Sequence, residues 1–256
     1  MVILCDGMHR SGSTWSFNVA LKLVGLCDPD RKTFGLYNDN PVVIRAAIRP
    51  RSSHLVIKSH TLDPSAYELC CKGDIKAIYT WRHPYDVVFS GMRIFDFSAE
   101  HCIGLLRNSL RLWSFHRQTG SACVIPYQAI LLEPLATIER IASWLGMQIG
   151  PHQLRQVADE VSLERLKDLS QRIDHLEPRR VVRQDGFIYD RQTLLHQNHV
   201  MDGRMGHGAR MLECRQLLAI DAMLVEEGFG FLCQPHGVRG PDDAAIAQVR
   251  QQDDNR

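Results

Sequence analysis

The chain has 256 residues, of which 45% are hydrophobic and 23% charged, as in ordinary globular proteins. Its 30 Lys and Arg residues nearly balance its 29 Asp and Glu residues, which argues against a nucleic-acid coat or a polybasic membrane anchor. We expect one domain over residues 1–236. The segment 237–256 is rich in Asp, Gln, Arg and Gly, a composition typical of a disordered tail.

Cysteine usage and the first residues predict a cytoplasmic protein. The eight cysteines are scattered and show no C-x-x-C spacing, which favours free thiols in a reducing compartment. Asp6 and Gly7 interrupt the first apolar run, so it lacks the length of a signal peptide core. No run reaches the roughly 18 to 20 apolar residues of a membrane span. We expect no membrane insertion and no nucleic-acid partner.

In chain order, short apolar runs alternate with helical patterns. Residues 2–6 read as a buried strand, and a helix begins near Ser13 after a Gly/Ser turn. Similar strand-like runs occupy residues 54–60, 74–83 and 121–127, and longer helical patterns occupy residues 98–118, 151–169 and 211–227. Residues 28–53 and 174–208 read as loop-rich segments. The alternation predicts an α/β fold, a three-layer sandwich with a central parallel sheet.

The turn after the first strand is spaced like a phosphate-binding loop. It fits the pattern G-x-x-x-x-G-K followed by Ser or Thr, except that Ser13 replaces the lysine, and it reads Gly7-Met8-His9-Arg10-Ser11-Gly12-Ser13-Thr14. Backbone N–H groups of such a turn and of the following helix bind a phosphate. The missing lysine argues against a β- or γ-phosphate as the ligand.

A second cation follows another predicted strand. Residues 75–80 lead into Thr80-Trp81-Arg82, where a kinase or ATPase would place a carboxylate for Mg²⁺. Arg82 instead suits direct binding of a second anion. We therefore expect a nucleotide with one 5′-phosphate and another phosphate elsewhere, bound without a metal.

These residues resemble the PAPS-dependent sulfotransferase family, whose donor is 3′-phosphoadenosine-5′-phosphosulfate (PAPS). The family's loop, a basic residue before S-G-T-T-W, is matched by Arg10-Ser11-Gly12-Ser13-Thr14-Trp15. The resemblance implies that Arg10 lies beside the bridging oxygen, that residues 11–14 hold the 5′-phosphate, and that Trp15 stacks on adenine. On the residues alone, Trp15 also fits a core position on its helix.

The family's second motif has an arginine at a strand end and a serine eight residues later, which together bind the 3′-phosphate. Arg82 and Ser90 match it. Pro84 and Asp86 between them suit the first turn of a helix. The resemblance therefore assigns the 3′-phosphate to Arg82 and Ser90.

The run His54-Leu55-Val56-Ile57-Lys58-Ser59-His60 is similar to the family's lysine and histidine element. Lys58 and His60 lie on the same side of an extended strand. The resemblance makes His60 the general base and gives Lys58 and Arg10 the charge on the sulfuryl oxygens.

Weaker matches extend to about residue 230. Tyr127 at the end of the last predicted strand is similar to a family tyrosine that can contact the nucleotide. Gly203 and Arg204 are similar to a late loop that closes over the 3′-phosphate. The usual G-D-W-K ending of that loop reads Gly206-His207-Gly208-Ala209 here, which leaves lid closure open.

The resulting hypothesis is a sulfotransferase that moves the sulfuryl group of PAPS to a hydroxyl or amine of a small-molecule acceptor. Adenosine 3′,5′-bisphosphate (PAP) is the product, and no metal is expected. Two alternatives remain at this point, a small-metabolite kinase with a phosphate loop and a non-catalytic nucleotide-binding protein. The acceptor does not follow from the sequence, although aromatic residues that could line its pocket are Phe34, Tyr37, Phe95, Phe97 and Phe115.

Overall fold

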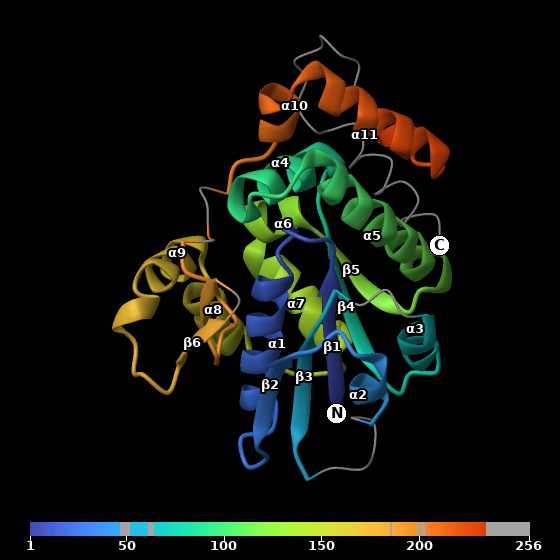
Figure 1. Ribbon diagram of the computed structural model, residues 1–256. Coiled ribbons are helices and arrows are strands. Elements are labelled where there is room, and N and C mark those ends of the chain that lie inside the picture. The colour runs from blue at the N-terminus through green and yellow to red at the C-terminus, as the bar shows by residue number, and fades with distance from the viewer. Residues whose placement is uncertain (47–51, 61–63, 185, 199, 201–202, 234–256) are drawn as a thin grey trace. The chain divides into compact units, whose positions relative to one another are not determined.

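A computed structural model describes residues 1–46, 52–60, 64–184, 186–198, 200 and 203–233. Its centre is a five-stranded parallel sheet (Figure 1). The sheet has the order β2-β3-β1-β4-β5, formed by β1 (Val2–Gly7), β2 (Thr33–Tyr37), β3 (His54–Lys58), β4 (Lys76–Trp81) and β5 (Ala122–Pro126). The predicted α/β class with a central parallel sheet is confirmed.

One face of the sheet packs on α1 (Ser13–Cys27), the helix that follows the glycine turn. Alternate strand residues Ile3, Cys5 and Ile78 point to this side and share a core with Phe17 of the helix. Helices α7 (Pro134–Trp144) and α8 (Pro151–Glu160) extend the layer beside α1. The central strands are mostly apolar, as predicted from the sequence.

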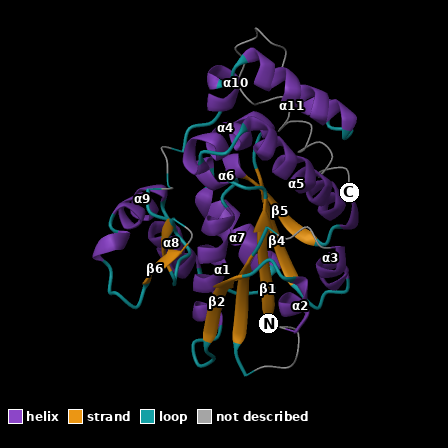
Figure 2. Cartoon of the chain, in the orientation of Figure 1, coloured by secondary structure: helices purple, strands orange, loops and turns teal. Residues whose placement is uncertain are grey.

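The opposite face carries larger aromatic residues. Tyr79, the neighbour of Ile78 in β4, points the other way and lies 5.3 Å from the ring of His116, between ring centroids. Trp81 packs similarly on Trp113, with centroids 5.0 Å apart. His116 and Trp113 belong to α5 (Ala99–Thr119), so the sheet has helices on both faces (Figure 2). This face also carries α3 (Pro64–Cys71), whose Tyr67 ring lies 5.7 Å from that of His116.

The described residues divide into two compact units. The first joins Met1–Arg82 to Leu112–Gly203 and contains the whole sheet. The second joins His83–Arg111 to residues 204–233 and consists of α4 (Pro84–Phe95), most of α5, α10 (His207–Met211) and α11 (Cys214–Glu226). The predicted boundary at residue 236 stays a prediction, and the predicted tail 237–256 lies outside the described residues.

A buried carboxylate organises the second unit. Asp86, in the first turn of α4, accepts hydrogen bonds from the N–H groups of Gly206 (2.9 Å) and Gly208 (2.8 Å). Only glycine fits at position 208, because a Cβ there would lie 2.2 Å from the carbonyl of Tyr85.

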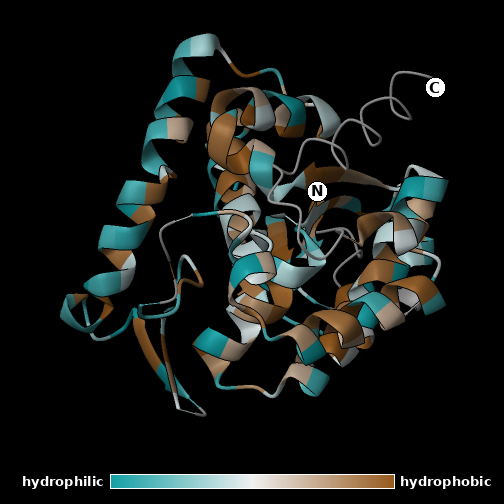
Figure 3. Cartoon of the chain, turned by 90° about the horizontal axis from the view of Figure 1, so that it is seen from above, coloured by the Kyte–Doolittle hydropathy of each residue, from teal (hydrophilic) through white to brown (hydrophobic). Residues whose placement is uncertain are grey.

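Hydrophobic and hydrophilic bands alternate along most helices (Figure 3), as expected for helices with one buried side.

Three segments differ from their predicted form. The helical pattern 151–169 is two helices, α8 and α9 (Leu163–Gln171), because Ser162 caps the second by accepting from the Arg165 N–H. The loop-rich segment 28–53 contains the edge strand β2 and the short helix α2 (Pro41–Ala46). The segment 174–208 contains an antiparallel hairpin, β6 (Val181–Gln184) and β7 (Phe187–Asp190).

Candidate active site at the carboxyl edge of the sheet

Because all five strands run parallel, the segments that leave their carboxyl ends meet at one edge of the sheet, the upper edge in Figure 1. Open α/β sheets bind ligands at this edge. Its central strand is β1, which lies between β3 and β4. The edge gathers most of the predicted site, namely the glycine turn after β1, Lys58 and His60 at β3, Arg82 after β4 and Tyr127 after β5.

The glycine turn is fastened to the neighbouring strand β4. The Met8 N–H donates to the Thr80 carbonyl (2.9 Å), and the Ser11 hydroxyl lies 2.6 Å from the Met8 carbonyl and 2.7 Å from the Thr80 hydroxyl. A Cβ on Gly7 would stand 2.2 Å from Thr80 Oγ1, so only glycine fits there. The Ser11 side chain thus shapes the loop, and its predicted contact with a phosphate stays a prediction.

The loop ends in the first turn of α1, as predicted from the sequence. Gly12 has φ 99°, a left-handed conformation, and its missing Cβ leaves room for Ile130, which would otherwise be 2.7 Å away. The helix begins at Ser13, so the N–H groups of its first turn, including that of Thr14, have no acceptor within the helix. Such a helix start attracts an anion.

Two arginines lie next to each other at this edge. Arg82 Nη1 is 3.4 Å from the carbonyl oxygen of Arg10, and the Arg82 guanidinium lies 4.3 Å from the centre of the Tyr127 ring. Burial lowers the pKa of Arg10 to about 10, and the charge of Arg82 acts in the same direction. Like charges held this close repel each other, and a bound dianion would relieve that repulsion.

His60 is held in one tautomer. Its Nδ1 lies 2.7 Å from the carbonyl oxygen of Gly7. Since a carbonyl can only accept, Nδ1 carries the hydrogen and Nε2 keeps a lone pair. Lys58 Nζ is 3.4 Å from that Nε2. Burial first, and then the charge of Lys58, hold the pKa of His60 well below its usual value, so the imidazole is neutral. A neutral imidazole with an unprotonated Nε2 can accept a proton from a reacting group.

Asp39, which the sequence analysis missed, fixes the backbone beneath this pair. It follows the edge strand β2 and accepts hydrogen bonds from the His60 N–H (2.6 Å), the Ser59 hydroxyl (2.8 Å) and the Tyr37 hydroxyl. The Tyr37 ring lies beside Lys58, 5.0 Å from Nζ to the ring centre. Tyr37 was named only as a possible pocket wall. Its pairing with Lys58 across β2 and β3 would have revealed the contact, but β2 was not predicted.

His9, inside the glycine turn, was also missed. Its imidazole stacks on that of His60 with centroids 4.2 Å apart and planes at 18°. In the sequence it occupies a variable position of the loop pattern, so spacing gave no signal for it.

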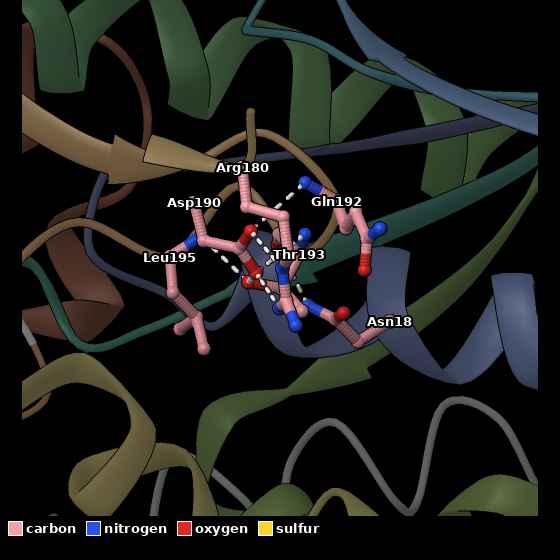
Figure 4. Close-up of polar contacts among 6 residues, drawn as sticks. All are labelled: Asn18, Arg180, Asp190, Gln192, Thr193 and Leu195. Atoms are coloured by element: carbon pink, nitrogen blue, oxygen red, sulfur yellow. Dashed lines mark hydrogen bonds and ion pairs between the residues drawn. The ribbon is translucent and has the colours of Figure 1, made fainter. Parts of the chain in front are cut away.

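The chain after β7 is anchored on the helix that follows the loop (Figure 4). The carboxylate of Asp190 is fully buried and accepts two hydrogen bonds from Arg180 (2.7 and 3.0 Å) and one from the Thr193 hydroxyl (2.6 Å). The Asn18 amide then donates both to the Thr193 carbonyl (2.9 Å) and to the Thr14 carbonyl in the first turn of α1 (2.7 Å). The hairpin is therefore fixed against the start of α1.

This anchoring brings His196 toward the same edge. Its ring stacks on Tyr189 at 5.4 Å between centroids. Burial lowers the pKa of His196 to about 4, and the positive charges of Lys58 and Arg10 contribute to the lowering. His196 is therefore neutral, and it is a further residue of this edge that no motif indicated.

The remaining predicted binders are Trp15, Gly203, Ser90 and Arg204. Trp15 is 7% exposed, belongs to the α1 core and donates its indole N–H to the Val161 carbonyl (3.1 Å), so its stacking on adenine stays a prediction. Gly203, with φ 70°, lies against Leu131 and Leu163. Ser90 and Arg204 belong to the second unit, where Ser90 is buried and Arg204 is exposed. Their contacts with a nucleotide stay predictions.

A sulfotransferase domain model matches residues 3–201 of the chain. The chain belongs to the sulfotransferase domain family. This membership confirms the predicted family and the predicted enzyme class, and it gives the kinase alternative no support. No sequence among curated proteins matches the chain.

Solved structures share the fold of this sulfotransferase. Retinol dehydratase in a complex with retinol and PAP has a TM-score of 0.63 and 16% identity, covering 94% of this chain and 83% of that one. Mouse sulfotransferase SULT7A1 complexed with PAP has a TM-score of 0.64 and 13% identity, covering 98% and 88%. Retinol dehydratase with androsterone and the inactive cofactor PAP has a TM-score of 0.61 and 14% identity, covering 94% and 83%.

Two absences hold for the described part of this sulfotransferase. Within it, no group of three or more His, Cys, Asp and Glu residues could hold a metal ion. No helix within it has the length and hydrophobicity to cross a bilayer. The cytoplasmic location and the metal-free reaction stay predictions.

Proposed function

We propose that this enzyme transfers the sulfuryl group of PAPS to a hydroxyl or amine of a small-molecule acceptor, with His60 as general base. The observation that carries the proposal is the state of His60, which is neutral and has an unprotonated Nε2 3.4 Å from Lys58 Nζ, beside the glycine turn. The solved structures named above were crystallised with PAP, and two of them also hold retinol or androsterone. These ligands support a PAPS-type donor and a small acceptor here.

The donor would lie along the carboxyl edge between β1 and β5. N–H groups at Ser13 and Thr14 would bind the 5′-phosphate, and Arg82 would bind the 3′-phosphate as a two-pronged donor. Ser90, which belongs to the second unit, stays a predicted ligand of the 3′-phosphate. PAPS supplies an activated sulfuryl group, so the protein needs to position it and to neutralise charge.

In the transfer, His60 Nε2 accepts the acceptor proton as the acceptor atom forms its bond to sulfur. The bond from sulfur to the bridging oxygen breaks, and PAP leaves with that oxygen. Arg10 stabilises the charge that grows on the bridging oxygen, and Lys58 stabilises the equatorial sulfuryl oxygens. Nδ1 keeps its hydrogen throughout and donates it to the Gly7 carbonyl.

Calorimetric titration with PAP, in EDTA and again with Mg²⁺, tests the binding half of this proposal. We expect the same affinity in both, because cationic side chains rather than a metal hold the phosphates. An acceptor screen with labelled PAPS then tests transfer. Magnesium-dependent ATP turnover would instead identify a kinase, and PAP binding without any sulfated acceptor would identify a non-catalytic binding protein.

The charge of Lys58 sets an upper pH limit. Burial lowers its pKa to about 8, and the repulsion by Arg10 acts in the same direction. The ammonium is present below this value and is lost as the pH rises through it, so kcat/KM for PAPS should fall on the alkaline side near pH 8. In Lys58→Arg the guanidinium stays charged, and the fall should move to higher pH. An unchanged profile in Lys58→Arg would remove Lys58 as its origin.

A further inference from the structure

The imidazole of His9 lies parallel to that of His60, and no role has been assigned to it in the transfer. We propose that His9 is a positioning residue, whose ring holds the plane of His60 so that Nε2 stays directed at the acceptor. The inference rests on the proposed function of His60 as general base. The geometry that carries it is the stack itself, 4.2 Å between centroids at 18°.

The other restraints on His60 leave its ring incompletely fixed. Asp39 holds the His60 backbone N–H at 2.6 Å, and the Gly7 carbonyl holds Nδ1 at 2.7 Å. Lys58 Nζ lies 3.4 Å from Nε2. Contacts at these two ring nitrogens still allow the ring to tilt about the line that joins them. A flat ring on one side removes this tilt, because any tilt breaks the stacking contact.

The His9 ring and the Gly7 carbonyl belong to the same loop. His9 is two residues from Gly7, in the turn that the Met8 N–H and the Ser11 hydroxyl fasten to Thr80. Both contacts to His60 therefore move together. Misplacement of a reacting group by about 1 Å can cost about 100-fold in rate. Holding both contacts on one loop therefore keeps the general base in position.

His9 also acts on the charge of His60. It is one of the groups that lower the pKa of His60, after burial and Lys58. The charge of Arg10 acts in the same direction. This supports the neutral form of His60, but the ring geometry alone defines the role of His9.

The test compares His9→Ala, which removes the stacked ring, with His9→Phe, which keeps a flat ring. Nitrogen NMR of ¹⁵N-histidine-labelled protein, run without any acceptor, reports the His60 tautomer. We expect a protonated Nδ1 and an unprotonated Nε2 in the wild type and in His9→Phe, and an average of the two tautomers in His9→Ala. His152→Ala, at an exposed position of α8, is the matched control and should leave the His60 signals unchanged.

Kinetics with the acceptor found by the screen give the second readout. For His9→Ala we expect kcat to fall by about 10-fold, with the Kd of PAP within about threefold of the wild type, because only the base is misplaced. His9→Phe should recover most of kcat. A fixed tautomer in His9→Ala, or equal losses in the two variants, would overturn the proposal.

A loss of PAP affinity at unchanged kcat would also overturn it, since His9 would then serve the phosphate loop. The NMR result does not depend on transfer. If the wild type binds PAP but sulfates no acceptor, the proposed function fails while the tautomer comparison still decides the positioning role.

Discussion

Replacing His60 with alanine is expected to lower turnover by about 100-fold or more while PAP affinity stays nearly unchanged, because the variant loses its general base but keeps both phosphate sites. Discontinuous assays with labelled PAPS measure the turnover, and calorimetry measures the affinity for PAP. The effect should be on kcat at saturating donor, since Nε2 acts in the transition state rather than in donor binding.

Alanine at this position also removes the donor to the Gly7 carbonyl, so a second variant separates the two roles. His60→Asn can still donate its amide hydrogen toward Gly7, but it cannot take up a proton. Both variants should be equally slow if the base is what matters. The exposed His175 provides the control His175→Ala. Near-normal turnover in His60→Asn would remove His60 from the role of base.

The second large effect is expected at Arg82, where methionine should weaken PAP binding by about 100-fold, the loss typical of a charge-assisted pair. Comparison with AMP makes the test specific, because AMP lacks the 3′-phosphate. The wild type should prefer PAP strongly over AMP, and Arg82→Met should lose that preference while AMP affinity changes little. Calorimetric titration with both nucleotides measures the ratio.

Arg172→Met is the matched control, since Arg172 is exposed, directly follows α9 and pairs with Asp168 of that helix. It should leave the PAP to AMP ratio as in the wild type. If Arg82→Met weakens both nucleotides equally, Arg82 supports the loop or the 5′-phosphate instead. The 3.4 Å contact from Arg82 to the Arg10 carbonyl would then be its main contribution.

The sequence was sufficient for the parts of the fold with strong local signals. The helix begins at Ser13 and another begins at Pro84, as predicted, because a glycine turn and a first-turn proline mark helix starts regardless of tertiary context. The residues at the ends of four strands could be placed at one edge for a different reason. The carboxyl ends of parallel strands all lie at the same edge of the sheet.

The edge strand β2 could not be predicted in the same way. Its sequence, Thr33 to Tyr37, includes Gly35, is largely exposed and lacks a clear alternation. Its position depends on pairing with β3 and on the packing of Phe17 against Gly35, where a Cβ would lie 2.6 Å away. Strand formation of this kind is decided by neighbours rather than by propensity. Asp39 and its bond to His60 were missed as a result.

Buried charges caused the other gap in the site. Asp190 and Arg180 lie in the segment that read as loop-rich, and no pattern in the sequence indicated that Asp190 is fully buried. Only the fold shows that Arg180 and Thr193 surround the carboxylate. Without that anchor, nothing in the sequence indicates that His196 approaches the cations of the site. The role of a single histidine or acidic residue depends on its hydrogen-bond partners, which only the fold shows.

The attachment of the glycine turn to β4 has a consequence for how ligands arrive. Ser11 and Met8 bond to Thr80 within the protein itself, so the curvature of the turn does not depend on an occupant. An incoming nucleotide therefore loses its own freedom on association but orders little backbone. Its arrival rate should then follow ionic strength, as for an encounter guided by charge, rather than a slow rearrangement of the chain.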